Sequence, residues 1–250
     1  MERWQSKLAV VTGASVGIEA SIAADLVKNG FIVVALARRE GRLRENQKAL
    51  PENLQSRYHL RKCDVTNEDH VKDTFAWIEA KFGGTDVLVN NAGVLASGVE
   101  LTSLDNTEPI RNVVETNIMG VVYCVREAFN SMKKRSFDGH IVIINSIAGH
   151  YVPIAPFGTL NIYAASKFAV TAMVETYRQE FVKAGTKVKV TSISPGLVLT
   201  EILPNMEGFR DLGNPILNAE DVSNAILYVL STPPHVQVHE LTIRPVGEKL

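Results

Sequence analysis

Short apolar runs alternate along the chain with longer segments in which apolar residues recur every three or four positions. The short runs are rich in β-branched residues and predict strands at 8–11, 32–36, 58–63, 87–89, 141–144, 188–193 and 241–243. The longer segments predict helices at 19–28, 68–82, 108–134, 157–183 and 219–230. The runs at 87–89 and 141–144 are almost wholly apolar, which is typical of strands covered on both faces.

Strands and helices alternate throughout, and this alternation predicts the fold class. We expect an α/β fold with a doubly wound parallel sheet of the Rossmann type, in three layers α/β/α. No change in composition divides the chain and no internal repeat occurs, so residues 1–250 are expected to form a single domain.

One long irregular stretch, at about 197–218, combines proline and glycine with many large apolar residues. It follows the carboxyl end of a predicted strand, the edge where ligands bind in open α/β sheets. We interpret it as a lid over an apolar ligand; the alternative is a loop that packs on the core.

Composition excludes several classes of partner. The 250 residues are 46% hydrophobic and 21% charged, with a net charge of −1, so there is no basic excess for nucleic acid or an anionic membrane. No stretch approaches the roughly 18 consecutive apolar residues that a membrane span needs, and no apolar run typical of a signal peptide opens the sequence. Cys63 and Cys124 are too few for a disulfide framework or a metal site. We expect a cytoplasmic protein with a small-molecule partner and no metal.

A glycine-containing turn joins the first predicted strand to the first predicted helix. It reads Thr12-Gly13-Ala14-Ser15-Val16-Gly17-Ile18-Glu19. Gly13 can adopt backbone angles closed to other residues, and Gly17 lets the main chain approach a bulky ligand. The helix N-terminus then presents unpaired N–H groups and a partial positive charge to a phosphate. A plain turn is the alternative, but this position favours a dinucleotide-binding loop.

The end of the second predicted strand distinguishes between the two nicotinamide dinucleotides. NAD-binding folds place a carboxylate there, about 20 residues past the glycines, to hold the ribose 2′-hydroxyl. Here the segment reads Ala35-Leu36-Ala37-Arg38-Arg39, with no acid. Guanidinium groups suit a 2′-phosphate in charge and in geometry, so we predict NADP(H), although two solvated surface arginines would produce the same pattern.

Candidate catalytic groups follow other predicted strands. Tyr163 and Lys167 are four residues apart, so on a helix they share one face. A tyrosine titrates near pH 10, and a neighbouring ammonium is expected to lower that pKa and make the hydroxyl useful in proton transfer. Ser146 follows the fifth strand and can bind a substrate oxygen. Small residues at 90–93 and at 195–196 end two further strands at the same rim of the sheet.

The ordered set of motifs resembles the short-chain dehydrogenase/reductase family over essentially the whole chain. The matching positions are Thr12 to Ile18, Asp64-Val65, Asn90-Asn91-Ala92-Gly93, Asn117, Ser146, Tyr163 with Lys167, and Pro195-Gly196 with Thr200. The start Met1-Glu2-Arg3-Trp4 and the segment Ala37-Arg38-Arg39-Glu40 further resemble the family's NADP-dependent insect farnesol dehydrogenase group and its vertebrate relatives that act on steroids and other ketones.

This resemblance implies a role for each catalytic position. Tyr163 would exchange a proton with the substrate oxygen, and Lys167 would lower its pKa and hold the nicotinamide ribose. Ser146 would orient the oxygen, and Asn117 would fix a water that carries the proton onward. The cofactor supplies the hydride, so the chemistry needs no metal.

The cofactor-binding positions are likewise implied by the resemblance. Asp64 and Val65 would meet the adenine, 91–93 the adenosine-side ribose region, and 195–200 the nicotinamide side. The full set is Gly13, Ser15, Val16, Gly17, Ile18, Arg38, Arg39, Asp64, Val65, Asn91, Ala92, Gly93, Tyr163, Lys167, Pro195, Gly196, Val198 and Thr200.

One position departs from the family pattern. Glu19 stands where the family carries a third glycine, which normally lets the helix pack closely on strand and cofactor. A carboxylate in a first helical turn is favourable toward the helix dipole, yet it would repel a pyrophosphate if it pointed inward. We expect it to point to solvent, and Glu19→Gly to tighten NADPH binding.

Apolar residues dominate both the predicted lid and the segment 147–154 after Ser146. Such a pocket selects a lipophilic alcohol or carbonyl substrate, for which a terpenoid alcohol such as farnesol fits, with a steroid or retinoid carbonyl compound as the alternative. A non-catalytic NADPH-sensing or lipid-binding protein on the same fold is the alternative of another class. His150 is either a specificity residue or a structural one.

The predicted helices 108–134 and 157–183 contain more small and apolar residues than one core needs. In the resembling family such helices pair between subunits, which implies a homodimer or homotetramer.

Overall fold

The computed structural model describes residues 1–15, 17–96, 98–153, 159–200, 202, 213 and 215–248. Most of the predicted lid at about 197–218 therefore lies outside the described residues, as does Val16. Glu19 belongs to a described helix, but the orientation expected for its side chain lies outside what the structure describes.

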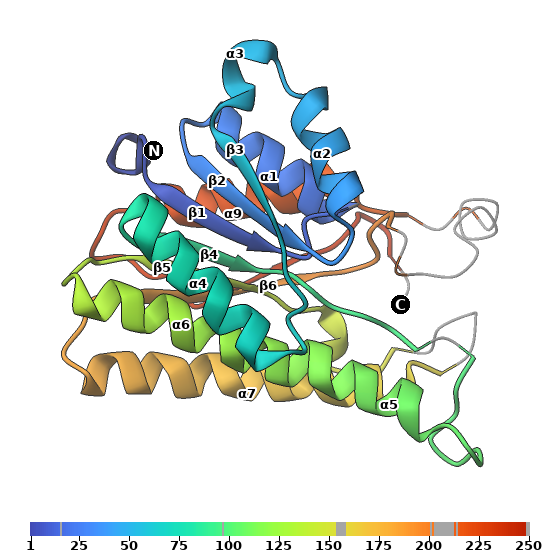
Figure 1. Cartoon of the computed structure of the whole chain (residues 1–250). Coiled ribbons are helices and arrows are strands. Elements are labelled where there is room, and N and C mark those ends of the chain that lie inside the picture. The colour runs from blue at the N-terminus through green and yellow to red at the C-terminus, as the bar shows by residue number, and fades with distance from the viewer. Residues whose placement is uncertain are drawn as a thin grey trace.

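Seven parallel strands form one sheet in the order β3-β2-β1-β4-β5-β6-β7 (Figure 1). They are β1 (Leu8–Thr12), β2 (Ile32–Ala37), β3 (Tyr58–Lys62), β4 (Val87–Asn90), β5 (His140–Ile144), β6 (Lys189–Pro195) and β7 (Glu240–Ile243). The strand order reverses between β1 and β4, and a crevice for a ligand opens at such a switch point. The predicted doubly wound parallel sheet is confirmed, with every predicted strand present within two residues of its expected bounds.

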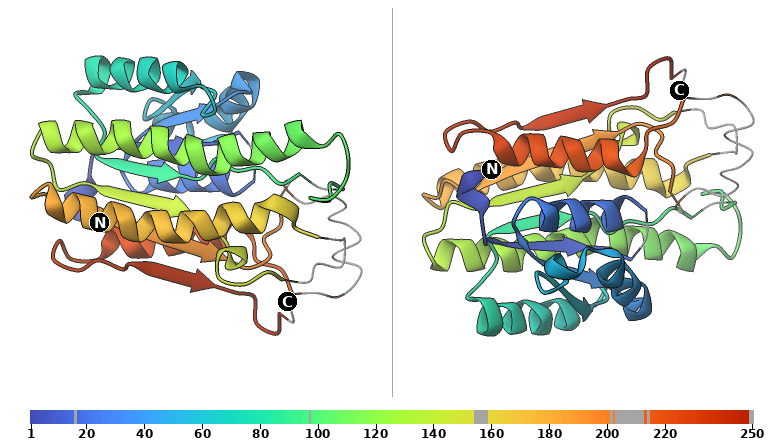
Figure 2. Two further views of the ribbon diagram at one scale, coloured as in Figure 1. Left: turned by 90° about the horizontal axis from the view of Figure 1, so that it is seen from below. Right: turned by 90° about the horizontal axis from the view of Figure 1, so that it is seen from above.

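Helices cover both faces of the sheet (Figure 2). On one face lie α1 (Ile18–Lys28), α2 (Glu40–Ala49) and α9 (Ala219–Ser231), of which α1 and α9 pack against each other. On the other face lie α4 (Glu68–Phe82), α6 (Gly120–Lys134) and α7 (Asn161–Lys183). The three layers of the prediction are thus present.

The central strands β1, β4, β5 and β6 are buried on both sides, because successive residues point to opposite faces and helices cover both faces. Ala9 and Val11 of β1 belong to the core beneath α1 and α9, whereas Leu8 and Val10 belong to the core beneath α4, α6 and α7. Every residue of β1 is buried. This double burial explains why β1, β4 and β5 are almost continuously apolar rather than alternating.

Local sequence signals define several helix ends. Asn67 accepts a hydrogen bond from the backbone N–H of His70 at the start of α4, and Gly83 ends that helix in the left-handed conformation. At the start of α9, Asn218 and Asp221 form a reciprocal capping box. These caps satisfy backbone groups that the helix ends would otherwise leave unpaired.

Two features differ from the helices expected from the sequence. The segment predicted as one helix at 108–134 is divided into α5 (Thr107–Val114), a π-helical turn (Glu115–Met119) and α6. The helix α2 and the short α3 (Glu52–Gln55) were not predicted, because α2 is highly polar and buries only Leu43. A helix without an apolar stripe leaves no periodic signal in the sequence.

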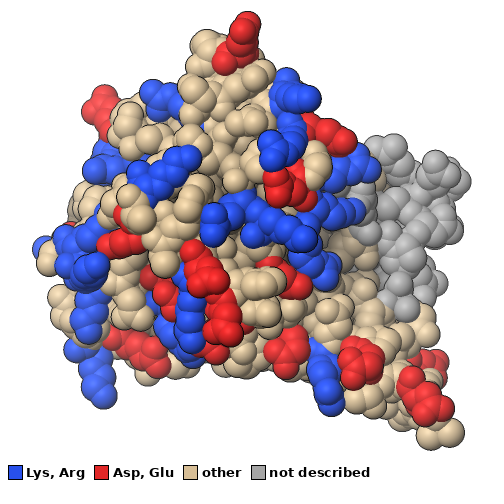
Figure 3. Space-filling view, in the orientation of Figure 1, with Lys and Arg blue, Asp and Glu red and all other residues tan. Residues whose placement is uncertain are grey.

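Two short turns and the start of α7 complete the description of the secondary structure. Two 3-10 turns lie at Glu2–Trp4 and Ile147–Gly149, and α7 begins at Asn161, four residues after its expected start at 157, a position outside the described residues. None of the helices in the described ranges is long and apolar enough to cross a membrane. On the face drawn in Figure 3, basic and acidic side chains are intermixed.

Candidate active site

A cavity of about 660 Å³ opens at the carboxyl ends of the strands. Its wall is formed by residues that follow β1, β2, β3, β4, β5 and β6, together with residues of α7. The predicted site residues that line it are Gly13, Ser15, Ile18, Arg38, Arg39, Asp64, Val65, Asn91, Ala92, Gly93, Ser146, Tyr163, Lys167, Pro195, Gly196, Val198 and Thr200. Gly17 and Asn117 are not part of this wall.

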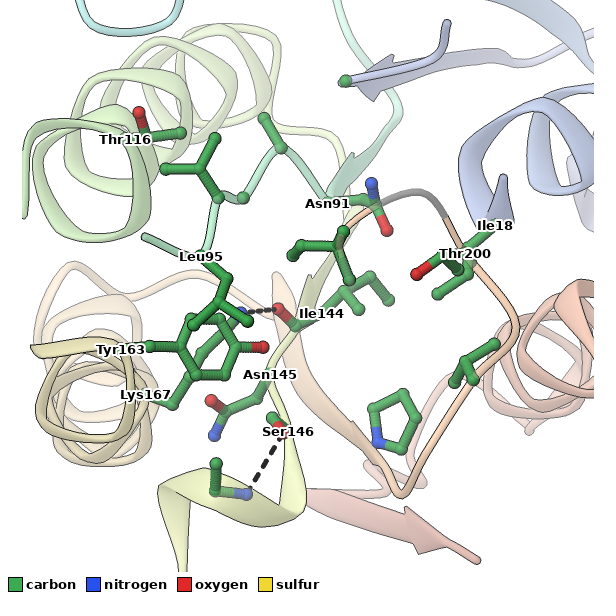
Figure 4. Close-up of a pocket in the computed structure, with 18 of the residues that line it drawn as sticks. Ile18, Asn91, Leu95, Thr116, Ile144, Asn145, Ser146, Tyr163, Lys167 and Thr200 are labelled. Carbon is green, nitrogen blue, oxygen red and sulfur yellow. Dashed lines mark hydrogen bonds between the residues drawn. The ribbon is translucent and has the colours of Figure 1, made fainter. Parts of the chain in front are cut away.

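Tyr163, Lys167 and Ser146 lie together in this cavity (Figure 4). The first two come from one face of α7, as their spacing predicts, and Tyr163 directs its hydroxyl toward the cavity. The Lys167 ammonium lies 5.6 Å from the centre of the Tyr163 ring and donates a hydrogen bond to the Ile144 carbonyl at 2.9 Å. Ser146 follows β5 and accepts a hydrogen bond from the Ala148 N–H at 3.1 Å. A proton donor, a cation and a hydroxyl therefore share one site.

The acid–base properties of this group differ from the sequence expectation. Burial raises the pKa of Tyr163 to about 12, and a hydrogen bond with Ser146 opposes that rise. Burial also lowers the pKa of Lys167 to about 8. The expectation that Lys167 would bring the tyrosine pKa below its ordinary value was wrong for this structure, because desolvation of the phenolate dominates. At neutral pH, Tyr163 is a protonated phenol beside a largely charged lysine.

Asn117 lies in the π-helical turn between α5 and α6 and is buried. Its amide nitrogen donates to the Val94 carbonyl and to Ser166 Oγ, both at 3.0 Å, and its oxygen accepts from the Val94 N–H at 2.9 Å. These bonds tie the segment after β4 to α7, the helix that carries Tyr163. The side chain thus acts on the cavity wall through its neighbours, and π-helical turns are frequent at functional sites.

The loop between β1 and α1 is built for close approach of the main chain. Gly13 has a φ of +80°, and a Cβ at this position would lie 2.9 Å from the Ala92 Cα. Only glycine fits between the two strand ends. Gly17 also has a positive φ, +73°, and precedes the first turn of α1. Both positions thus use backbone angles that favour glycine, and phosphate binding by this loop stays a prediction.

Two residues from the β2–α2 region contact this loop. Arg39 Nη2 donates to Ser15 Oγ at 3.1 Å, which places a guanidinium directly over the predicted phosphate loop. Asn46 of α2 donates from its amide nitrogen to the carbonyl oxygens of Ala14 and Ser15, at 3.1 and 3.3 Å. Sequence reasoning missed Asn46 because α2 itself was not predicted.

Two buried amide atoms in the cavity wall lack a hydrogen-bond partner within the described residues. They are Asn91 Nδ2 and Asn145 Oδ1. The backbone of Asn91 is held in place, since its N–H donates to Thr12 Oγ1 at 3.0 Å. Leaving a buried polar atom unpaired is costly, so each such group in a native structure requires an explanation. Both residues line the cavity, although these two atoms are themselves buried.

The wall around Tyr163 is otherwise largely apolar, including Leu95, Ile147, Pro153 and Leu160. His150 does not line the cavity; its Nε2 lies 2.6 Å from Glu240 Oε1 and 3.1 Å from Ser194 Oγ. Of the two interpretations of His150, these contacts favour the structural one.

Comparison with known proteins places this geometry in a family. Residues 7–210 match the short chain dehydrogenase profile. The chain is 56% identical over 249 residues to farnesol dehydrogenase of Aedes aegypti, with 100% of both chains covered. It is 39% identical over 262 residues to dehydrogenase/reductase SDR family member 11 of Mus musculus, covering 99% of this chain and 97% of that one.

Among solved structures, an alcohol dehydrogenase from the archaeon Thermococcus sibiricus complexed with 5-hydroxy-NADP has the same fold. The two share 26% identity with a TM-score of 0.82, covering 98% of this chain and 99% of that chain. The profile spans most of the sequence, and the curated relatives match along nearly its whole length. Most of the motif positions that indicated the family line the cavity, and the chain is an oxidoreductase that belongs to the short-chain dehydrogenase family.

Proposed function

We propose that the protein transfers a hydride between NADP(H) and a lipophilic alcohol or carbonyl compound, with farnesol as the first substrate to test. The observation that carries this proposal is the convergence of Ser146, Tyr163 and Lys167 on one largely apolar cavity. The rest of the wall suits a dinucleotide at one end of the cavity and an apolar molecule at the other end.

Each catalytic group has a separate role in carbonyl reduction. Tyr163 keeps its proton at neutral pH because burial raises its pKa to about 12, so its hydroxyl can deliver that proton to the substrate oxygen. Ser146 hydrogen-bonds the same oxygen, and the Lys167 ammonium stabilises the phenolate that remains. In alcohol oxidation each transfer runs in reverse. The nicotinamide, when bound, supplies or accepts the hydride.

Residues at the other end of the cavity fit NADP(H). Gly13 allows the main chain to approach a pyrophosphate, and Arg39 with Ser15 would hold the 2′-phosphate through charge-assisted hydrogen bonds. Asn91 has a buried amide nitrogen still able to donate. The structural relative from Thermococcus sibiricus carries an NADP derivative, which supports the choice of NADP(H) over NAD(H).

The substrate assignment rests on the apolar wall of the cavity and on the similarity of the chain to a relative of known name. Leu95, Ile147 and Leu160 offer no charged group to a sugar or an acid, so a hydrocarbon chain or ring system is favoured. The relative that is 56% identical over the full chain is named farnesol dehydrogenase, which supports a terpenoid alcohol over a steroid or retinoid.

A kinetic comparison tests both parts of the proposal. We expect kcat/KM to be higher with NADPH than with NADH, and higher with farnesol or farnesal than with steroid ketones, retinal or sugar alcohols. A preference for NADH would contradict the cofactor assignment, and a preference for sugar alcohols would contradict the apolar pocket. Binding of NADPH without turnover of any of these compounds would favour a sensor or carrier.

We also propose that the chain self-associates. A groove of about 460 Å³ between α6 and α7 is lined by Phe129, Met173, Tyr177 and Phe181, and the Phe129 and Phe181 rings stack 4.1 Å apart. Covering this groove with the same groove of a second copy would give a homodimer, from which a homotetramer can be built. Light scattering should give at least twice the 27.4 kDa chain mass; a strict monomer would contradict it.

A further inference from the structure

Glu248 lies five residues after the end of β7 and lines the same cavity as Ser146 and Tyr163. Its side chain is only 3% exposed, although it follows a highly exposed turn. A carboxylate is rarely buried this far without bonds that hold it there. Nothing in the sequence pattern indicated this residue as part of the site.

Both carboxylate oxygens have defined partners. The Leu197 N–H donates to Oε1 at 3.0 Å, and Arg244 Nε donates to Oε2 in an ion pair. A Cβ at Gly196 would lie 2.7 Å from Oε1 and 3.0 Å from Oε2. The carboxylate therefore packs directly on the Pro195-Gly196 bend, and a side chain at position 196 would force it to move.

The backbone of Leu197 is held through its carbonyl group as well as through its N–H. The Leu197 carbonyl accepts from the Leu217 N–H at 2.8 Å, and the Leu199 N–H donates to the Leu217 carbonyl at 2.9 Å. Val198 lies between these bonds, in register with Leu217. The position of Leu197 thus determines where Val198, and Thr200 after it, stand in the cavity wall.

Arg244 also contacts the segment that follows Ser146. Its guanidinium lies 5.7 Å from the centre of the Tyr151 ring, in the segment that follows Ser146. The ion pair with Glu248 raises the pKa of Arg244 above its ordinary value. Arg244 is 40% exposed, so it can anchor the carboxylate from the solvent side while Glu248 reaches inward.

We propose that Glu248 is a positioning residue for the cofactor. It holds the Leu197 amide, and through it Val198 and Thr200, in the geometry that receives the nicotinamide end of NADP(H). The inference rests on the proposed function, which assigns 195–200 to that end. Glu248 takes no part in proton transfer, for which Tyr163 is placed.

Variants that separate the two bonds of Glu248 test this role. Glu248→Ala removes the acceptor for Leu197, and Glu248→Gln keeps an acceptor oxygen but loses the charge. Arg244→Gln leaves the carboxylate in place and removes both the ion pair and the guanidinium over the Tyr151 ring. Val246→Ala is the matched control, since Val246 lies in the same turn and is 98% exposed. The Kd for NADPH is measured by fluorescence, well below the melting temperature of each variant.

We expect Glu248→Ala to raise the Kd for NADPH about tenfold, the order of effect of one charge-assisted hydrogen bond. Glu248→Gln should restore binding to within about threefold of wild type, because its amide oxygen can still accept from Leu197. Arg244→Gln should fall between these two, and Val246→Ala should match wild type. A role in stability alone would lower Tm without this order of Kd values.

Hydrogen exchange of the Leu197 amide gives a readout that needs no cofactor. Exchange should be faster in Glu248→Ala than in wild type or Val246→Ala. An unchanged Kd for NADPH in Glu248→Ala would overturn the inference, and if that variant does not fold, unchanged Kd values in both Glu248→Gln and Arg244→Gln would do so. Failure of the wild-type protein to bind NADPH would instead overturn the proposed function, and the inference with it.

Discussion

At the residue scale, Arg39 connects the end of β2 to the loop that follows β1, through its hydrogen bond to Ser15 Oγ. Arg39→Ala should lower kcat/KM with NADPH about tenfold or more, because a charge-assisted contact to the 2′-phosphate is lost. The value with NADH should stay nearly constant, since that cofactor has no 2′-phosphate. Arg42→Ala, which removes a surface arginine of α2, serves as control. Equal losses with both cofactors would contradict the role given to Arg39.

The pKa of Lys167 leads to a prediction about how the activity depends on pH. Burial lowers its pKa to about 8, so the ammonium is present below that value and is lost as the pH rises through it. Tyr163 keeps its proton up to about pH 12. The kcat/KM for carbonyl reduction should therefore fall above about pH 8 as the supporting charge disappears.

The pH–rate profile of Lys167→Arg provides the comparison. Arginine stays charged throughout the range, so any activity that this variant retains should not show the fall above about pH 8. A wild-type profile that is flat to about pH 10 would show that the charge of Lys167 does not support proton transfer.

At the scale of elements, the π-helical turn between α5 and α6 connects the segment after β4 with α7 through Asn117. Asn117→Leu removes three hydrogen bonds and leaves the Val94 backbone groups unpaired in a partly buried position. We expect the free energy of unfolding to fall by about 3 kcal/mol. We also expect kcat to fall, because α7 carries Tyr163. Denaturant titration and kinetics measure the two effects, with the exposed Asn112→Ala as control. A stable variant with wild-type kcat would contradict this coupling.

The elements differ in how far the sequence predicts them. Strands buried on both faces, such as β4 and β5, are continuous apolar runs, and their existence and order follow from that pattern. The helix α2 has no apolar stripe, and the π-helical turn keeps nearly the same apolar spacing as an α-helix. Hydrophobic periodicity therefore predicts neither element, although α2 supplies Asn46 and the π-helical turn supplies Asn117 to the surroundings of the site.

At the scale of the whole molecule, the predicted site residues come together because parallel strands all end at one edge of the sheet. Residues at strand ends, such as Gly13 and Ser146, were therefore predictable from motif order alone. Asn46 and Glu248 reach the site through tertiary contacts with segments 31 to 51 positions away. No local pattern reports contacts of that range.

Stability of the whole molecule should decrease in mild acid because of His140. Burial lowers its pKa in the folded protein to about 3 from an ordinary value of 6.5. Between these values the unfolded chain binds a proton and the folded protein does not, so stability falls as the pH drops below 6.5. The loss should be about 1 kcal/mol between about pH 7 and 5.5. Denaturant titrations of wild type and His140→Gln measure it; identical pH dependence in both would exclude His140 as the source.

The most direct test of the central claim compares wild type with Tyr163→Phe in the presence of NADPH and farnesal, or NADP and farnesol. Phenylalanine keeps the ring and removes only the hydroxyl that the cavity presents to the substrate. We predict turnover in wild type, followed by nicotinamide absorbance, and a loss of at least about a hundredfold in the variant with little change in the Kd for NADPH. Turnover that persists at the wild-type rate in Tyr163→Phe would contradict the account.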